Sequence, residues 1–132
     1  MHELINPPSL PRPRGFSHAV AAAPGRVVYL GGQAGHRSDG TLRGPGLLDQ
    51  LDQALANVVT ALDAAGGQPL HLVSIQILVT DAGAYRSHLD EIGEIWRRHL
   101  GRHYPAVALV EVSGLFDPEA MVELLCVAVV PG

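Results

Sequence analysis

Two carboxylates lie in the most apolar segments of this chain, and carboxylates can move protons or position water. Glu111 lies in the segment PAVALVEV, and Glu123 lies in AMVELLCVAVV. Side chains alternate between the faces of a strand, so Glu123 shares its face with the apolar residues two, four and six positions further on. An unpaired charge there is costly, so each acid must be paired, hydrogen-bonded or close to water. Two interpretations stay open for each acid, a structural carboxylate or a general acid or base.

Histidine and serine suggest less chemistry. His99 and His103 are four residues apart, which is a possible metal-binding spacing on a helix, but Gly101 predicts that the helix ends between them. Ser17 and His18 are adjacent, so they point to opposite faces of a strand and do not form a nucleophilic pair.

The glycine-rich segment GGQAG, residues 31–35, follows an expected strand without opening a helix. It contains neither G-x-G-x-x-G nor G-x-x-x-x-G-K-[ST], the patterns that bind nucleotide phosphates. Its bare backbone suits a bulge, or close approach by a ligand or another chain. We therefore expect no cofactor and no metal.

The composition bounds the class of protein. The chain has 132 residues, 47% of them hydrophobic and 17% charged, and a net charge of −4. This length predicts one domain over residues 1–132, and the apolar composition favours an oligomer. Because no basic patch appears, nucleic acid is a weak candidate partner.

The single cysteine, Cys126, lies in an apolar strand and is interpreted as a core residue. A chain without an intrachain disulfide suits a reducing compartment. No segment resembles a signal peptide or a membrane span, so we expect a cytoplasmic protein with no membrane partner.

The periodicity predicts a β-β-α-β-α-β-β order after a proline-rich arm at residues 6–15. Pro24 and Gly25 are expected to join the first two strands as a hairpin. Asp81 is expected to cap the second helix. The expected strands cover residues 16–23, 26–35, 71–81, 106–112 and 121–130, and the expected helices start at Leu48 and after Asp81.

Each expected helix has one apolar stripe. The first comprises Leu48, Leu51, Leu55, Val58 and Leu62, and the second Tyr85, Leu89, Ile92, Trp96 and Leu100. Both stripes predict packing on one face of a mixed sheet. The strands stay apolar on both sides, so the other sheet face is expected to pack against other subunits.

Seven stretches along the chain form one ordered pattern: NPP, RGFSHAV, VYLGGQAG, QLDQALANVVTALDAAGG, VSIQILVTD, YPAVALVEVSGL and VELLCVAVV. Together they resemble the Rid family, the YjgF-like reactive-intermediate deaminases that are also labelled endoribonuclease-like. The resemblance implies a chorismate-mutase-like α+β fold and a homotrimer with a central barrel. It also implies a ligand cleft at each subunit interface.

The resemblance also implies roles for individual residues. In deaminating members a glutamate in the last strand positions the water that attacks an imine, and Glu123 matches it. Gly32 and Gln33 match the loop that lines the cleft. Phe16 stands where many members have tyrosine.

The chain departs from the family pattern on the expected substrate-binding strand. Val107 replaces the arginine that grips the substrate carboxylate, and Leu109 replaces a common cysteine. Valine cannot make a charge-assisted contact with a carboxylate. Arg14 is a candidate substitute anchor, and Glu111 is expected to be structural.

Three functions follow as hypotheses. The first is hydrolysis of a small imine, enamine or related C–N compound in an intersubunit cleft, with Glu123 positioning water. The second is a regulatory trimer that binds a small metabolite without turnover. The third, an endoribonuclease, is disfavoured by the acidic composition.

Overall fold

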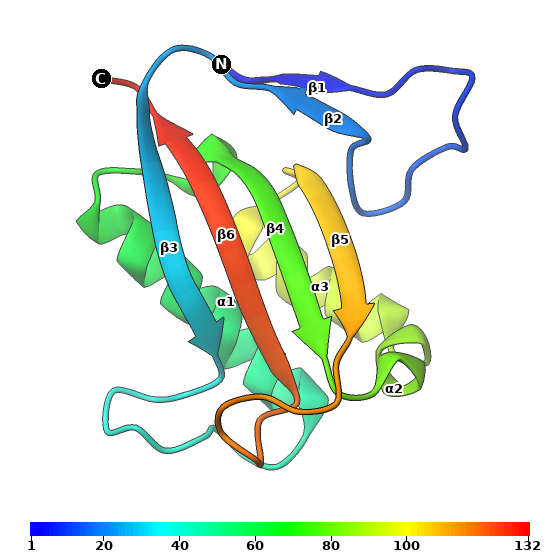
Figure 1. The fold of residues 1–132 in the computed structure, drawn as a ribbon, viewed down its shortest axis with the longest axis vertical. Coiled ribbons are helices and arrows are strands. Elements are labelled where there is room, and N and C mark those ends of the chain that lie inside the picture. The colour runs from blue at the N-terminus through cyan, green and yellow to red at the C-terminus, as the bar shows by residue number, and fades with distance from the viewer.

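A computed structural model describes residues 1–132 of the chain. Figure 1 shows a sheet with helices behind it and a separate hairpin above it. The elements are, in order, β1 (Glu3–Ile5), β2 (Ala19–Ala21), β3 (Arg26–Ala34), α1 (Leu47–Ala64), η1 (Pro69–His71), β4 (Leu72–Val79), α2 (Ala82–Arg86), α3 (Leu89–Leu100), β5 (Ala106–Glu111) and β6 (Val122–Val130).

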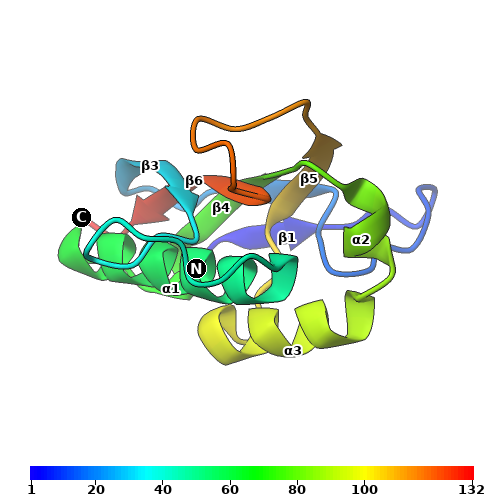
Figure 2. The ribbon, with the colours of Figure 1, turned by 90° about the horizontal axis from the view of Figure 1, so that it is seen from below.

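The main sheet has the strand order β3-β6-β4-β5. β4 and β5 are parallel, whereas β6 runs antiparallel to both of its neighbours, so the sheet is mixed. Figure 2 shows α1 and α3 together on one face of this sheet. The predicted α+β class, with helices covering one face of a mixed sheet, is therefore confirmed.

The core lies between the helices and this face of the sheet. Residues of the first predicted stripe, Leu51, Leu55, Val58 and Leu62, are almost fully buried, and Leu48 packs at their edge. They meet alternate side chains of the central strands, among them Ile75, Ile77, Val122, Leu124 and Cys126. Burial raises the pKa of the Cys126 thiol to about 12, as expected for a core residue. None of the helices combines the length and apolar character that crossing a bilayer requires.

The predicted hairpin between the first two strands is wrong. β2 pairs with β1 in a separate two-stranded sheet, whereas β3 pairs along most of its length with β6. β3 is an edge strand that pairs with β6 on one side only, and β2 pairs with β1 rather than with its free edge. His2 ties the small sheet to the main one, because its ring accepts the Ala23 N–H and donates to the Val129 carbonyl.

The second predicted helix is divided in two. Asp81 caps α2 as expected, by accepting the Ala84 N–H at 3.0 Å. Ser87 and His88 then contact the Ala84 carbonyl through their side chains, which competes with helix continuation. Leu89 therefore starts α3 with 56% exposure, outside the buried stripe in which it was predicted.

Asp52 fastens the loop between β3 and α1 to the helices. Its carboxylate accepts hydrogen bonds from Arg43 on that loop and from Arg98 and His99 on α3. Burial alone would raise the pKa of Asp52, but the hydrogen bonds from His99 and Arg43 hold it below its usual value. The base of the loop is thus held in place.

Gln50 is a buried polar residue in the apolar face of α1, with no exposed surface. Its side-chain oxygen accepts the Met121 N–H at 2.7 Å. Its nitrogen donates to the carbonyls of Gly44 and Glu119, at 3.1 and 3.2 Å. One amide therefore fixes both loops that flank the start of β6.

We expect the substitution Gln50→Leu to lower the free energy of unfolding by about 2–4 kcal/mol, because it leaves buried backbone groups without partners. Gln53→Leu, on the same helix, is the matched control. It removes one hydrogen bond to Asn57 and should cost less than about 1 kcal/mol. Urea unfolding of both variants measures the difference. Equal decreases in the free energy of unfolding would show that the hydrogen bonds of Gln50 contribute no more to stability than the one that Gln53 makes.

Candidate functional site

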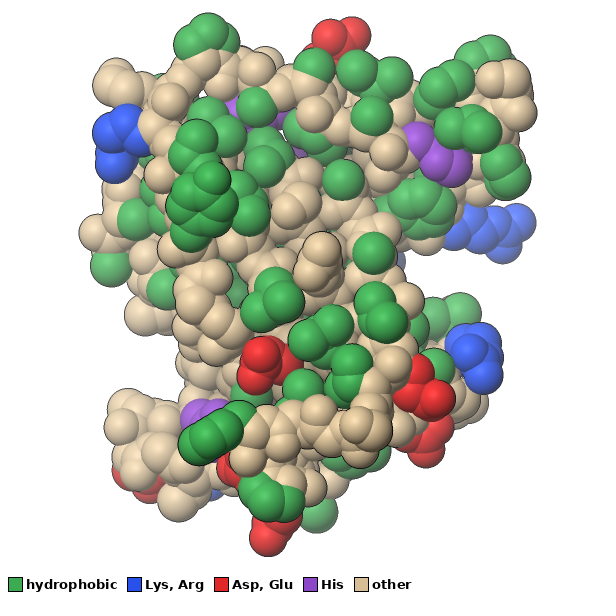
Figure 3. Space-filling view, in the orientation of Figure 1, with side chains coloured by type: hydrophobic (Ala, Val, Ile, Leu, Met, Phe, Trp, Pro, Cys, Tyr) green, Lys and Arg blue, Asp and Glu red, His purple; other side chains and the backbone are tan.

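The sheet face opposite the helices is left open and is largely apolar. Figure 3 looks onto this face and shows hydrophobic side chains over the strands, interrupted by acidic groups. Tyr29 is 79% exposed on it, and Val27 and Val110 are also exposed. Such a surface marks an interaction site.

Glu123 belongs to this open face. It lies opposite Leu78 of β4 and Ala34 of β3, and Leu125 is next to it on the same face. The side chain is half-buried and makes no hydrogen bond or ion pair with any other residue. The carboxylate is thus free to bind a ligand or a water molecule.

Gly32 sets the space around this carboxylate. The ladder between β3 and β6 shifts between Leu30 and Gln33, which places Gly31 and Gly32 in a bulge. A Cβ atom on Gly32 would lie 2.6 Å from Oε2 of Glu123 and 3.2 Å from a methyl group of Leu125. A side chain here would have to displace the end of the Glu123 side chain, so the two predicted site residues Gly32 and Glu123 do lie together.

Glu111 has a different role. Its Oε1 accepts the N–H of Ala82 at 2.9 Å, at the N-terminus of α2. A carboxylate at this position satisfies a free helix N–H and interacts favourably with the helix dipole. The two acids that the sequence singled out therefore differ in surroundings, since Glu111 has a backbone partner and Glu123 has none.

Phe16 and Val107 share a second location, a cavity of about 270 Å³ at the β5 edge. The segment before β2 runs along the start of β5, where the Ser17 N–H donates to the Pro105 carbonyl at 2.9 Å. The Phe16 ring lies edge-on to His18, with ring centroids 5.2 Å apart. We call this space the edge cavity.

The structure does not bring Val107 of the edge cavity and Glu123 together within one protomer. Val107 pairs with the core residue Ile75, so its side chain is on the helix-covered face of the sheet. Leu109 pairs with Ile77 and is on the same face. Glu123 faces the opposite side of the sheet, with β4 between β6 and β5. Two strand spacings alone separate the strands by roughly 10 Å.

A second hollow, which we call the polar groove, lies along the outer edge of β3 beside α1. Its volume is about 630 Å³, and its lining is almost entirely polar: Gly32, Gln33, Ala34, His36, Arg37, Ser38, Gln53, Asn57 and Thr60. The Asn57 side chain donates to the carbonyls of Ala34 and His36 and so shapes the wall of the groove. The sequence analysis assigned no role to Arg37 or Asn57.

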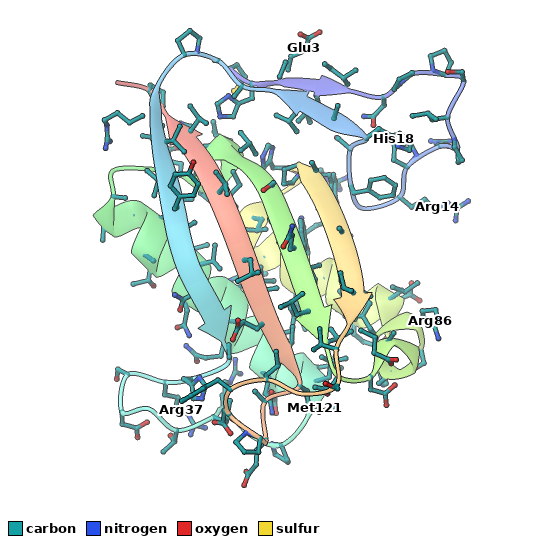
Figure 4. The ribbon with its side chains drawn as sticks, viewed as in Figure 1. Glu3, Arg14, His18, Arg37, Arg86 and Met121 are labelled. Carbon is teal, nitrogen blue, oxygen red and sulfur yellow. The ribbon has the colours of Figure 1, made fainter.

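The remaining candidates have separate surroundings. Arg14 is exposed on the loop before Phe16 and makes no ion pair; Figure 4 shows it pointing away from the sheet. His99 contacts Asp52, whereas the His103 ring contacts the Leu72 carbonyl at 2.8 Å. The two histidines thus bind different groups.

Comparisons with known proteins agree on one family. The family described as Endoribonuclease L-PSP matches residues 9–130. The human protein named 2-iminobutanoate/2-iminopropanoate deaminase is 30% identical over 101 residues, which are 76% of this chain and 69% of that protein. A RutC family protein of Pyrococcus horikoshii is 26% identical over 130 residues, covering 97% of this chain and 98% of that one.

Solved structures agree with these relatives. A Rid-family protein of unknown function from Yersinia pestis, YyfB, superposes with a TM-score of 0.88 at 30% identity and covers 98% of both chains. The RidA protein of an Antarctic Psychrobacter superposes with a TM-score of 0.70 at 28% identity, over 87% of this chain and 88% of that one.

We expect Gly32→Ala to displace the Glu123 carboxylate, because the new methyl group would overlap it. Gly31→Ala is the matched control, since a Cβ atom on Gly31 would meet no atom within 4 Å. Neither glycine has a positive φ angle, so the comparison isolates the contact. The carboxyl ¹³C resonance of Glu123 should shift in the first variant only, and an unchanged resonance in Gly32→Ala would contradict the contact.

Proposed function

Because the chain belongs to the Endoribonuclease L-PSP family, which includes the Rid and YjgF-like proteins, we propose that it hydrolyses a small imine or enamine. The observation that carries this proposal is the Glu123 carboxylate, which is half-buried on an apolar surface without a protein partner. Relatives named as imine deaminases support the reaction class.

The reaction needs a water molecule held beside the imine carbon. Glu123 accepts a proton from this water as its oxygen bonds to the carbon of the C=N group. The proton then passes to the nitrogen and gives a carbinolamine. Glu123 next moves the proton of the new hydroxyl group to the nitrogen, and the C–N bond breaks so that ammonia leaves as the carbonyl forms. Backbone N–H groups near Gly32 to Ala34 polarise the substrate, in the manner of other preorganised donors.

Val107 limits which substrates can bind. It stands where the resemblance places the arginine that binds a carboxylate, and it lines the edge cavity with Phe16. An apolar wall does not compensate a carboxylate charge. The proposed substrate is therefore neutral at this end, or carries its anionic group elsewhere.

A homotrimer would unite the separated parts of the site. Val107 and Glu123 lie on opposite faces of the sheet and two strands apart, so one ligand is expected to touch both only if they come from different protomers. The open sheet face with Tyr29 is the surface that such an assembly would cover. In this proposal each cleft combines Glu123 of one protomer with Phe16, Val107 and Leu109 of its neighbour.

Glu123→Gln should reduce ammonia release from a freshly generated imine by at least about 100-fold, as expected when a general base is lost. Glu111→Gln is the matched control and should keep the rate, because its carbonyl oxygen can still accept the Ala82 N–H. Full activity of Glu123→Gln would refute the role of this carboxylate.

Light scattering should give a mass near three times the 13.9 kDa protomer. Tyr29→Asp should shift the protein toward protomers, because it places a charge on the apolar face that the neighbours would cover. Ala64→Asp, at the exposed end of α1, should leave the mass unchanged. A stable wild-type monomer would overturn the shared cleft.

A second function, metabolite binding without turnover, is favoured by one observation, the valine at position 107. Without a carboxylate clamp, a ligand could occupy the cleft while no bound imine is oriented for attack. A ligand recovered unchanged, together with no ammonia release from any of a panel of imines, would support this alternative.

A further inference from the structure

The polar groove has the chemistry of an oxyanion site. None of its lining residues is acidic, and the lining includes the guanidinium of Arg37 and the hydroxyl groups of Ser38 and Thr60. A guanidinium with neighbouring polar donors is the arrangement that binds carboxylate or phosphate groups. The proposed hydrolysis uses only the backbone of Gly32 to Ala34 from this lining and leaves Arg37, Ser38 and Thr60 without a role.

Arg37 is available to a ligand. Its side chain is exposed and makes no ion pair, and its two hydrogen bonds, to the Thr41 hydroxyl and the Leu42 carbonyl, are both long at 3.4 Å. Asp39 is close enough to interact electrostatically, but its carboxylate accepts the N–H and O–H of Thr41. Several donors of the guanidinium thus remain free.

The groove borders the surroundings of Glu123. Gly32 lines the groove and also lies beside the Glu123 carboxylate, which occupies the space that a side chain at this position would take. Neither Gly31 nor Gly32 has a side chain that would separate the two places, and the edge of β3 has no partner strand. A ligand can therefore lie across the glycine bulge and reach both sides.

We propose that the polar groove binds the anionic group of the substrate through Arg37, in place of the arginine that is absent at position 107. This inference rests on the proposed hydrolysis at Glu123, and it defines the substrate class more closely. The substrate is an imine or enamine whose carboxylate or phosphate is not attached to the reacting carbon but is several bonds away from it.

This separation is also favourable electrostatically. A carboxylate attached to the reacting carbon would lie beside the negative charge of Glu123 and would be repelled by it. An anionic group in the groove is instead paired with Arg37, and Glu123 contacts only the reacting end. Loop movement is limited, because Asp52 holds Arg43 and Asn57 holds the His36 carbonyl.

The test measures anion binding apart from turnover, with inorganic phosphate and acetate as probes. Phosphate should shift the amide resonances of residues 32–38, and higher ionic strength should weaken its binding. Arg37→Ala should weaken binding by about 10- to 100-fold, the loss expected for a charge-assisted contact. Arg37→Lys should retain part of the affinity, because the charge remains.

Arg86→Ala is the control of equal charge change, since Figure 4 shows Arg86 beside α2, across the sheet from Arg37. It should leave phosphate binding unaltered, and thermal unfolding should confirm that each variant is folded. Unchanged affinity in Arg37→Ala would overturn the proposal. So would a loss of affinity confined to Arg14→Ala, which would assign the anchor to the loop before β2.

Kinetics separate this inference from the proposed hydrolysis. Arg37→Ala should raise KM for imines that carry a remote carboxylate, with little effect on imines of the same length without one. If Glu123→Gln stays fully active while Arg37→Ala loses phosphate, the hydrolytic role fails and the anion site stands. If Glu123→Gln is inactive and Arg37→Ala binds phosphate normally, the hydrolysis stands and the anion site fails.

Discussion

The helices cover only one face of the four-stranded sheet, and this constraint shapes the rest of the molecule. α1 and α3 bury alternate side chains of the central strands, so the other half of each strand must find a different environment. That half is apolar around Tyr29 and Val127, which pair across β3 and β6. An exposed apolar face of this kind is stable in water only where something covers it.

The same alternation decides what each acid can do. Glu111 is on the side of its strand that meets α2, where a helix N–H is available to it. Glu123 is on the uncovered side, where its neighbours are Leu78, Leu125 and the backbone of Gly32. A carboxylate without a protein partner is poised for an external one, which is why the proposed chemistry centres on Glu123.

Much of the architecture could be predicted from the sequence, because it follows from periodicity. The stripe of α1, the alternation in β4 and β6, and the Asp81 cap are local patterns with direct physical causes. The pairing of β2 could not be predicted in this way. It depends on β1, which lies before the proline-rich arm and pairs with β2, and this contact between distant segments has no periodic signal.

The candidate site was predictable only in part. Gly32 and Glu123 are 91 positions apart in the sequence, and it was the family resemblance that assigned both to one cleft. The sequence does not predict roles for Gln50 and Arg37. A glutamine in an apolar helix face and an arginine in a polar loop have no distinctive spacing. Their roles come from loops that fold back on α1 and β3, which periodicity does not describe.

The hydrogen bonds of Gln50 determine which part of the connection between β5 and β6 can change in length during evolution. Because Met121 is fixed to α1 and Val112 donates its N–H to Val79, the connection between β5 and β6 is secured at both of its ends. Its tip around Phe116 is fully exposed, and Figure 2 shows the connection rising from the open side of the sheet. Insertions or deletions at this tip should be tolerated without moving Glu123, so related proteins can vary the rim of the site while the reacting group stays in place.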